Sequence, residues 1–421
     1  MVKLIWDNKD KMLEEVNSDD FLKTDKYFEY DKDESKNFNT TENLYIEGDN
    51  LEALKLLQKN YQGKIKMIYI DPPYNTERKF IYNDTFRNKR KKECRHSGWI
   101  NMMYPRLKLA RDLLRDDGVI FISIDDNEVD NLKKVCNEIF GENNYLNQIV
   151  WQRNSSGKTV SKNLIVNIEY MLIYSKSYNY NFNPIYKPLA EATVKMYSKD
   201  DNDGRGKYRL YPLQKTSSPG PETTYDYVDN NGKVWKCPAK GWRMNKHKLK
   251  LLENDGRLCL ENDSLSEKAY WNERASHGKL ADTLWSDMPE NNVGTSEVSS
   301  LFDKVPVFNN PKPTQYLMRL LKMQTQKNNN DIILDFFSGS SSTAHAVMQI
   351  NSEDGGNRKF IMVQLPEETD EKSEARKAGY ENICEIGKER IRRAGDKIVE
   401  ENKDKEGIEN LDIGFKVIKI K

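Results

Sequence analysis

The amino-acid sequence predicts an α/β protein: a doubly wound, mostly parallel seven-stranded sheet that is interrupted by an inserted domain. Short apolar runs that indicate buried strands alternate with segments of helical periodicity, as at 65–70, 99–114 and 119–124. Such alternation is typical of parallel sheets with helices on both faces. Between 183 and 306 the alternation stops, and turn signals such as Pro219-Gly220-Pro221 replace it.

Each expected strand is a short apolar run, and each expected helix carries apolar residues three or four positions apart, as do Leu51, Leu54 and Leu57. The expected strands are 44–49, 65–70, 119–124, 149–151, 170–174, 331–335 and 360–364. The expected helices are 50–59, 99–114, 129–140, 314–323, 342–350 and 385–400. We therefore divide the chain into an acidic N-terminal extension, a first half of the sheet domain, the insert, a second half of the sheet domain and a tail, at 1–43, 44–182, 183–306, 307–400 and 401–421.

The composition is that of a globular protein and excludes several other classes. Of the 421 residues, 37% are hydrophobic and 10% aromatic, which is enough for a core. The apolar runs are far shorter than the ~20 residues that span a bilayer. Five scattered cysteines with no Cys-x-x-Cys pair argue against a disulfide framework and a zinc module. We expect a soluble, cytoplasmic protein without a metal site.

Positive charge gathers in two islands, although the whole chain is nearly neutral. Lys and Arg number 67 against 66 Asp and Glu, but residues 78–96 hold eight Lys/Arg against two acids and residues 187–250 hold fourteen against seven. Aromatic residues are interleaved with both islands: Phe80, Tyr82, Phe86, Tyr208, Tyr211, Tyr225, Tyr227, Trp235 and Trp242. The islands suit a nucleic-acid backbone with stacked bases or, equally, a solvated charged surface.

Asp71-Pro72-Pro73-Tyr74 directly follows a buried strand, where open α/β sheets bind their ligands. Two prolines remove two N–H donors, so the loop presents carbonyl groups and one carboxylate. Such a pocket suits an exocyclic amine, whose two N–H groups would go to Asp71 and to the carbonyl of Pro72. Tyr74 offers a ring on which the attached base would stack. A plain turn is the structural alternative.

A second candidate site is Asp335-Phe336-Phe337-Ser338-Gly339-Ser340-Ser341-Ser342-Thr343, which lies between a strand and a helix. Its small residues let the backbone approach a ligand, and the helix N-terminus favours a carboxylate or a phosphate. The run matches neither the dinucleotide-binding Gly-x-Gly-x-x-Gly pattern nor a P-loop. Because strand ends that are far apart in sequence meet at the switch point of a doubly wound sheet, we expect this segment to face Asp71.

Together these segments resemble the S-adenosylmethionine-dependent DNA amino-methyltransferases of the β class, in which the catalytic motif precedes the target-recognition region and the cofactor motif follows it. The resemblance covers about 41–180 and 305–400 and is closest to the modification (Mod) subunits of type III restriction systems. It rests on Asp71-Pro72-Pro73-Tyr74-Asn75-Thr76, Phe80-Ile81-Tyr82-Asn83-Asp84, Tyr104-Pro105-Arg106-Leu107 and Ile383-Cys384-Glu385-Ile386-Gly387-Lys388-Glu389-Arg390-Ile391.

The resemblance implies a circularly permuted methyltransferase sheet, S-adenosylmethionine as cofactor and a target-recognition role for the insert. It implies catalytic roles for Asp71, Pro72, Pro73 and Tyr74. The residues it implies in cofactor binding are Asp49, Phe308, Lys312, Pro313, Asp335, Phe337, Ser338, Gly339, Ser340, Gln364 and Glu367. In this sequence Ser341 replaces a common second glycine, and Gln364 replaces a common acidic ribose ligand, with Glu367 as the substitute. Double-stranded DNA, a second copy of the chain and a restriction subunit are the implied partners.

The expected reaction is direct transfer of a methyl group from a sulfonium to the exocyclic N6 of a flipped-out adenine. A covalent intermediate is not expected, because no cysteine directly follows a proline as cytosine-C5 chemistry would use. Cytosine-N4 methylation would use nearly the same pocket, and Asp71 favours adenine only through the resemblance. An RNA methyltransferase and a non-catalytic DNA-recognition protein with a methyltransferase fold are competing interpretations of the same residues.

Overall fold

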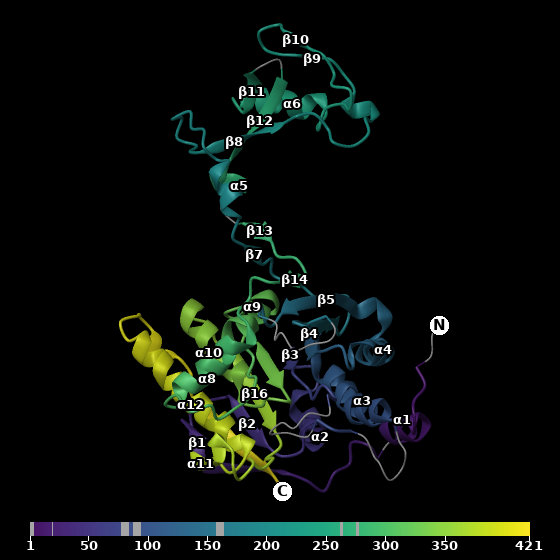
Figure 1. Cartoon of the computed structure of the whole chain (residues 1–421), viewed down its shortest axis with the longest axis vertical. Helices are drawn as coiled ribbons and strands as arrows, with labels where there is room; N and C mark the ends of the chain where they lie inside the picture. The colour runs from purple at the N-terminus through teal and green to yellow at the C-terminus, as the bar shows by residue number, and fades with distance from the viewer. Residues whose placement is uncertain are drawn as a thin grey trace. The chain divides into compact units, whose positions relative to one another are not determined.

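The computed structural model describes residues 4–421 apart from 19, 77–83, 87–93, 157–163, 262–263 and 275–277. Most of the first basic island therefore lies outside the described residues, as does Phe80-Ile81-Tyr82-Asn83. The chain forms two compact units (Figure 1), one of Met1–Asn183 with Asp282–Lys421 and the other of Pro184–Ala281. The expected insert was longer, because residues 282–306 belong to the larger unit, where Trp285 and Val298 are buried in the core.

In the described residues the larger unit holds a ten-stranded sheet, which seven predicted strands dominate. In spatial order those seven are β2 (Leu44–Glu47), β16 (Lys359–Gln364), β15 (Ile332–Asp335), β3 (Ile65–Ile70), β4 (Leu114–Ile124), β6 (Ile168–Ser175) and β5 (Tyr145–Gln152). The five from β2 to β4 are parallel, whereas β6 runs antiparallel to both of its neighbours. The expected α/β class with a mostly parallel sheet is confirmed.

Three further strands extend this sheet at its edges, so the expected number of seven is wrong. β17 (Phe415–Ile420) pairs parallel with β2, β1 (Phe28–Lys36) pairs antiparallel with β17, and β14 (Leu284–Trp285) pairs with β5. The segments expected to be an N-terminal extension and a tail therefore both contribute to the sheet. Phe415 and Val417 are fully buried, but Lys416 and Lys419 interrupt the apolar run that would have marked this strand in the sequence.

Helices cover both faces of the sheet (Figure 1). On one side lie α2 (Asn50–Tyr61), α3 (Arg95–Leu113) and α4 (Val129–Phe140), with α1 (Lys9–Asn17) packed on α3. On the other lie α8 (Asn291–Leu301), α9 (Thr314–Gln324), α10 (Ser342–Asp354) and α12 (Ile383–Glu401). The short helix α11 (Glu374–Lys377) precedes α12. No helix in the described part of the chain is long and apolar enough to cross a membrane.

The switch point of the sheet lies between β15 and β3, which are neighbours in the middle of the sheet. Ile333 and Leu334 pair with Met67 and Ile68, so the two strands end at the same edge. From here the connections lead to opposite faces, since β3 continues into α3 and β15 into α10. A ligand crevice is expected at such a point, and it brings Asp71 and Asp335 to one place.

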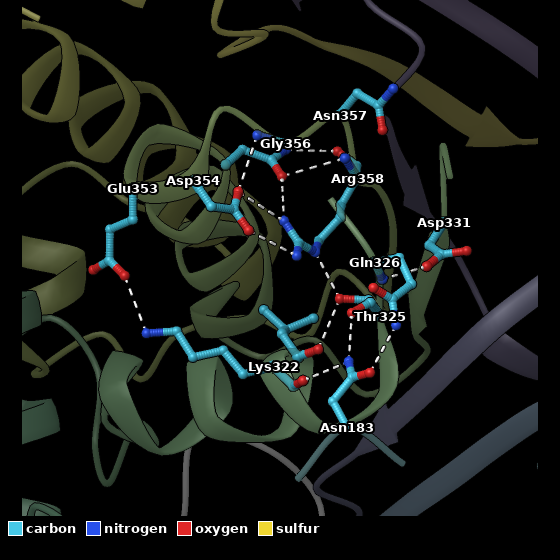
Figure 2. A network of polar contacts seen from close by, with 12 residues as sticks. Asn183, Lys322, Thr325, Gln326, Asp331, Glu353, Asp354, Gly356, Asn357 and Arg358 are labelled. Atoms are coloured by element: carbon cyan, nitrogen blue, oxygen red, sulfur yellow. Dashed lines mark hydrogen bonds and ion pairs between the residues drawn. The ribbon is translucent and has the colours of Figure 1, made fainter. Parts of the chain in front are cut away.

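A polar network fixes the chain where the first segment of the larger unit ends (Figure 2). The Asn183 amide donates to the carbonyls of Lys322 at 2.9 Å and Thr325 at 3.0 Å, at the C-terminal end of α9. The Thr325 hydroxyl accepts from Arg358 at 2.6 Å, and Arg358 pairs with Asp354 at 3.0 Å. Side chains thus join the ends of α9 and α10 to the start of β16 and hold Asn183 in place.

The smaller unit has a core of its own. Its strands are β7 (Tyr186–Lys187), β8 (Tyr208–Pro212), β9 (Tyr227–Val228), β10 (Val234–Trp235), β11 (Leu258–Glu261), β12 (Ser264–Tyr270) and β13 (Lys279–Leu280), and its helices are α5 (Glu191–Lys195), α6 (Lys246–Asn254) and α7 (Trp271–Arg274). Tyr227, Trp235 and Trp242 are buried in that core with Leu213 and Leu249. These three rings are therefore buried inside the unit and do not form the exposed stacking surface that was one of the two interpretations left open by the sequence.

Phe415→Ala tests whether the C-terminal strand is part of the folded core. Phe415 is fully buried beside Tyr45, so the substitution is expected to lower the free energy of unfolding by about 3–5 kcal/mol. The exposed Asp404→Ala, from the same stretch that the sequence presents as a tail, is expected to change it by less than about 0.5 kcal/mol. Urea unfolding of both variants measures the difference, and equal stabilities would contradict a structural role for β17.

Candidate functional site

A cavity of about 290 Å³ opens at the carboxyl ends of β2, β3, β15 and β16. Asp71 and Pro73 line it together with ten of the residues expected to bind the cofactor: Asp49, Phe308, Lys312, Asp335, Phe337, Ser338, Gly339, Ser340, Gln364 and Glu367. Among the described residues Pro72, Tyr74 and Pro313 are not part of the lining. Pro313 instead precedes α9 as its N-cap. The two motifs that the sequence singles out therefore face one space.

Phe308, Gln364 and helix α12 pack against the serine-rich loop between β15 and α10 and hold it in place. Gly339 has φ +51°, and a Cβ there would lie 3.1 Å from the ring of Phe308. The Gln364 side chain accepts a hydrogen bond from the Gly339 amide at 2.7 Å, so Gln364 shapes this loop. Ser341 adopts φ +63° without being glycine. A Cβ on Gly387 of α12 would come within 2.8 Å of the Ser341 hydroxyl, which shows how closely that helix packs.

Asp335 ends β15 as a buried carboxyl group on the cavity wall. Burial raises the pKa of Asp335 to about 7, although its oxygens accept hydrogen bonds from the Thr343 hydroxyl at 2.6 Å and the Phe337 amide at 3.1 Å. The negative charge of Asp71 acts in the same direction as burial. Near neutral pH this carboxyl group is therefore poised between its two protonation states.

The loop that follows β3 is fixed by hydrogen bonds from other elements. The Trp99 indole of α3 donates to the carbonyl of Pro73 at 2.7 Å. Asn75 adopts φ +59°, its amide N–H donates to Asp84 at 2.8 Å, and its side chain donates to the buried Glu128 at 2.6 Å. Hydrogen bonds from three other parts of the chain therefore fix the conformation of this loop, which weakens the alternative of a plain turn.

Lys312 forms the centre of a buried polar cluster next to Asp71. Its ammonium lies 2.7 Å from Asp71 Oδ2, 3.3 Å from Glu169 Oε2 and 3.1 Å from the Tyr74 hydroxyl. Tyr74 Oη lies 2.7 Å from Asp71 Oδ1, and Arg153 pairs with Glu169 at 2.9 Å. Both oxygens of Asp71 are thus engaged by donors.

Electrostatics keep this cluster charged. Burial opposes the charge of the Lys312 ammonium, but the carboxylates of Asp71 and Glu169 outweigh it and raise the pKa of Lys312. Burial likewise opposes the charge of Glu169, but Lys312 and Arg153 outweigh it and lower the pKa of Glu169. Burial and both carboxylates raise the pKa of Tyr74, so its phenol stays protonated and can donate.

Helix α8 holds the segment that carries Lys312. A Cβ on Gly294 would meet the carbonyl oxygen of Pro311 at 2.1 Å, so only glycine permits this approach. Glu297, one turn later, accepts hydrogen bonds from the amide and the hydroxyl of Thr314 at 2.9 and 2.8 Å. It thereby caps the first turn of α9, directly after Lys312.

Several residues of the site were not assigned a role from the sequence. One of them is Arg106 of α3, which lines the cavity and pairs at 3.2 Å with Asp49, the N-cap of α2 that was already expected to bind the cofactor. Arg153 directly follows β5 and Glu169 lies on β6, and the two residues form an ion pair that no sequence motif indicates. A charged residue at the start of the apolar run 170–174 was the available signal for Glu169, but its partners lie too far away in sequence to be inferred from it.

Comparison with known proteins identifies the family. A family model described as DNA methylase matches residues 65–392. The chain is 36% identical to the Type III restriction-modification enzyme StyLTI Mod subunit of Salmonella typhimurium, over 91% of this chain and 60% of that protein. It is 32% identical to the EcoP15I Mod subunit of Escherichia coli, over 92% and 66% of the two chains. It is also 32% identical to the Type II methyltransferase M.KpnI of Klebsiella pneumoniae, over 88% and 92%.

The chain thus spans about two thirds or less of the length of the two Mod subunits, but nearly all of M.KpnI. The matched family model covers most of the sheet unit and the whole of the smaller unit. It includes Asp71, Lys312 and Asp335, around which the cavity is built. The chain therefore belongs to the DNA methylase family.

Proposed function

We propose that this protein transfers a methyl group from S-adenosylmethionine to the exocyclic N6 of an adenine in double-stranded DNA. The observation that carries the proposal is that Asp71 and the serine-rich loop line one cavity. Methyl transfer needs the donor and the acceptor within about 3–3.5 Å of each other, so the two motifs must share a space. The relatives' names as Mod subunits and methyltransferases support DNA modification as the setting, with a restriction subunit as a partner.

The residues of the cavity fit the cofactor chemically. S-adenosylmethionine carries a sulfonium and an ammonium group, and carboxyl groups of Asp49, Asp335 and Glu367 line the cavity that would receive them. Phe337, Phe308 and Leu365 supply apolar surface for the adenine ring. When bound, the cofactor supplies the methyl group on its sulfonium. The chain's part is to orient the acceptor and to exclude water.

Asp71 would act by exchanging one hydrogen-bond donor for another. The Lys312 ammonium and the Tyr74 hydroxyl each donate to one of its two oxygens, and an incoming amine would take the place of one of these donors. Glu169, 3.3 Å from Lys312, is a second acceptor on which the ammonium can remain paired. Asp71 would then accept from the amine, so that the nitrogen lone pair is directed at the methyl group. Because a paired base cannot reach this loop, the adenine must be flipped out.

Asp71→Ala is expected to reduce methylation at least about 100-fold and to leave cofactor affinity within a few-fold. The assay uses unmethylated duplex DNA with radiolabelled S-adenosylmethionine, and calorimetry reports cofactor binding. Mass analysis of the digested DNA distinguishes N6-methyladenine from N4-methylcytosine, the product of the alternative reaction. The exposed Asp404→Ala serves as the control. Normal turnover by the Asp71 variant would remove the assignment, and failure of the wild-type protein to bind the cofactor would favour a non-catalytic protein.

Substitutions of Tyr74 separate its ring from its hydroxyl. Tyr74→Ala is expected to weaken capture of the target base by roughly 10- to 100-fold, because stacking on an aromatic ring is lost. Tyr74→Trp keeps a ring face and is expected to retain some activity. Tyr74→Phe loses only the hydroxyl 2.7 Å from Asp71, so kcat is expected to fall while the KM for DNA changes little. The stacking role is refuted if the Phe variant loses capture as completely as the Ala variant.

Cofactor binding is expected to depend on pH through Asp335. Because the pKa of Asp335 is raised to about 7, its carboxyl group is protonated below that pH. A cationic cofactor favours the carboxylate, so binding releases the proton, and affinity falls by up to about tenfold per pH unit below pH 7. Calorimetry between about pH 6 and pH 7.5 measures this slope, which Asp335→Asn should abolish. An identical slope in the variant would assign the titration to another group.

A further inference from the structure

We infer that Arg390 is a positioning residue that holds the hydroxyl groups of Ser340 and Ser342 as hydrogen-bond donors for the carboxylate of the bound cofactor. This inference rests on the proposed function, because it assigns one end of the same cavity. Arg390 belongs to α12 and is fully buried behind the serine-rich loop. Ser340 and Ser342, in contrast, line the cavity.

The polarity of these contacts follows from the chemistry of the guanidinium group. Arg390 Nη1 donates to Ser340 Oγ at 2.9 Å and to Ser342 Oγ at 2.6 Å. Because a guanidinium has donors only, each serine oxygen must accept from it, and each hydroxyl keeps its own proton for another acceptor. The two serines therefore face the ligand as donors. A charged donor behind them also makes their protons more strongly positive.

The positive charge of Arg390 is poorly compensated within the described structure. Its Nε and Nη2 atoms are buried without a hydrogen-bond partner there. Among the described residues it pairs with a carboxylate oxygen of Glu297, which lies 3.9 Å from Nη2 and already accepts from Thr314. Burial lowers the pKa of Arg390 to about 10, which still leaves the group charged at neutral pH. An anion that accepts from the two serine hydroxyls would complete the charge balance.

The charged groups around Ser340 and Ser342 favour an anion at that place in the cavity, whereas the groups on the rest of the wall do not. Ser342 is the first residue of α10, a helix of 13 residues, so the free amides and the dipole of its first turn add to the positive potential. Lys312 is a poor alternative partner for a ligand carboxylate, because its three donors already reach Asp71, Glu169 and Tyr74. Arg106, the other cation on the wall, already donates to Asn50, to the carbonyl of Met102 and to Asp49. The carboxyl groups of Asp49, Asp335 and Glu367 would repel a carboxylate.

The test compares two ligands that differ only in this group: S-adenosylmethionine and decarboxylated S-adenosylmethionine. Titration calorimetry measures both affinities for the wild-type chain of residues 1–421 and for its Arg390→Met variant. The variant is expected to bind S-adenosylmethionine roughly 10- to 100-fold more weakly and the decarboxylated ligand almost unchanged. Arg390→Lys keeps the positive charge but loses the planar guanidinium with its several donors. Its affinity for S-adenosylmethionine is expected to lie between those of the wild type and of Arg390→Met. Lys397→Met, an exposed change on the same helix, is the control.

A second variant keeps the test decisive if Arg390→Met does not fold. The double variant Ser340→Ala with Ser342→Ala should lose affinity for S-adenosylmethionine but not for the decarboxylated ligand. Adding Arg390→Met to this double variant should lower the affinity little further, because the guanidinium acts through the two hydroxyls. Equal weakening of both ligands, or no weakening, would overturn the inference while the proposed function stands. Wild-type protein that binds neither ligand would overturn the proposed function together with this inference.

Discussion

The arrangement of the site depends on one buried ammonium group. Lys312 pairs with Asp71 at the end of β3 and with Glu169 on β6, so a segment that follows the smaller unit in sequence is tied to two strands that precede it. Removing one partner of a buried pair typically costs about 3–5 kcal/mol, because the other charge is left uncompensated. The pairing therefore makes the geometry of the Asp71 loop depend on the segment between α8 and α9.

The cavity has an uneven distribution of charge that follows from its construction. Strand ends supply carboxyl groups, namely Asp49, Asp71 and Asp335, whereas the N-terminus of α10 and the guanidinium behind it supply positive potential. The positive potential at the N-terminus of α10 therefore favours a ligand orientation that places a carboxylate there.

The sequence predicted the centre of the fold well and its edges poorly. Strands such as Ile65–Ile70 are continuous apolar runs that end at a turn signal, and they are buried on both faces as that pattern indicates. β17 was missed because Lys416 and Lys419 interrupt its apolar residues, and the insert was made too long because α8 has weak apolar periodicity. Glu169 and Arg390 were missed for another reason: their roles arise from contacts with residues far away in sequence, which no local pattern encodes.

The tight packing behind the serine-rich loop has a consequence for how a ligand is received. Gly387 brings α12 so close to Gly339, Ser341 and Tyr45 that the loop has no room to retreat. Its shape is therefore settled during folding, and little conformational entropy remains to be lost when a ligand arrives. The Lys312 side chain, in contrast, has three polar partners and can exchange one of them for a ligand without movement of the main chain.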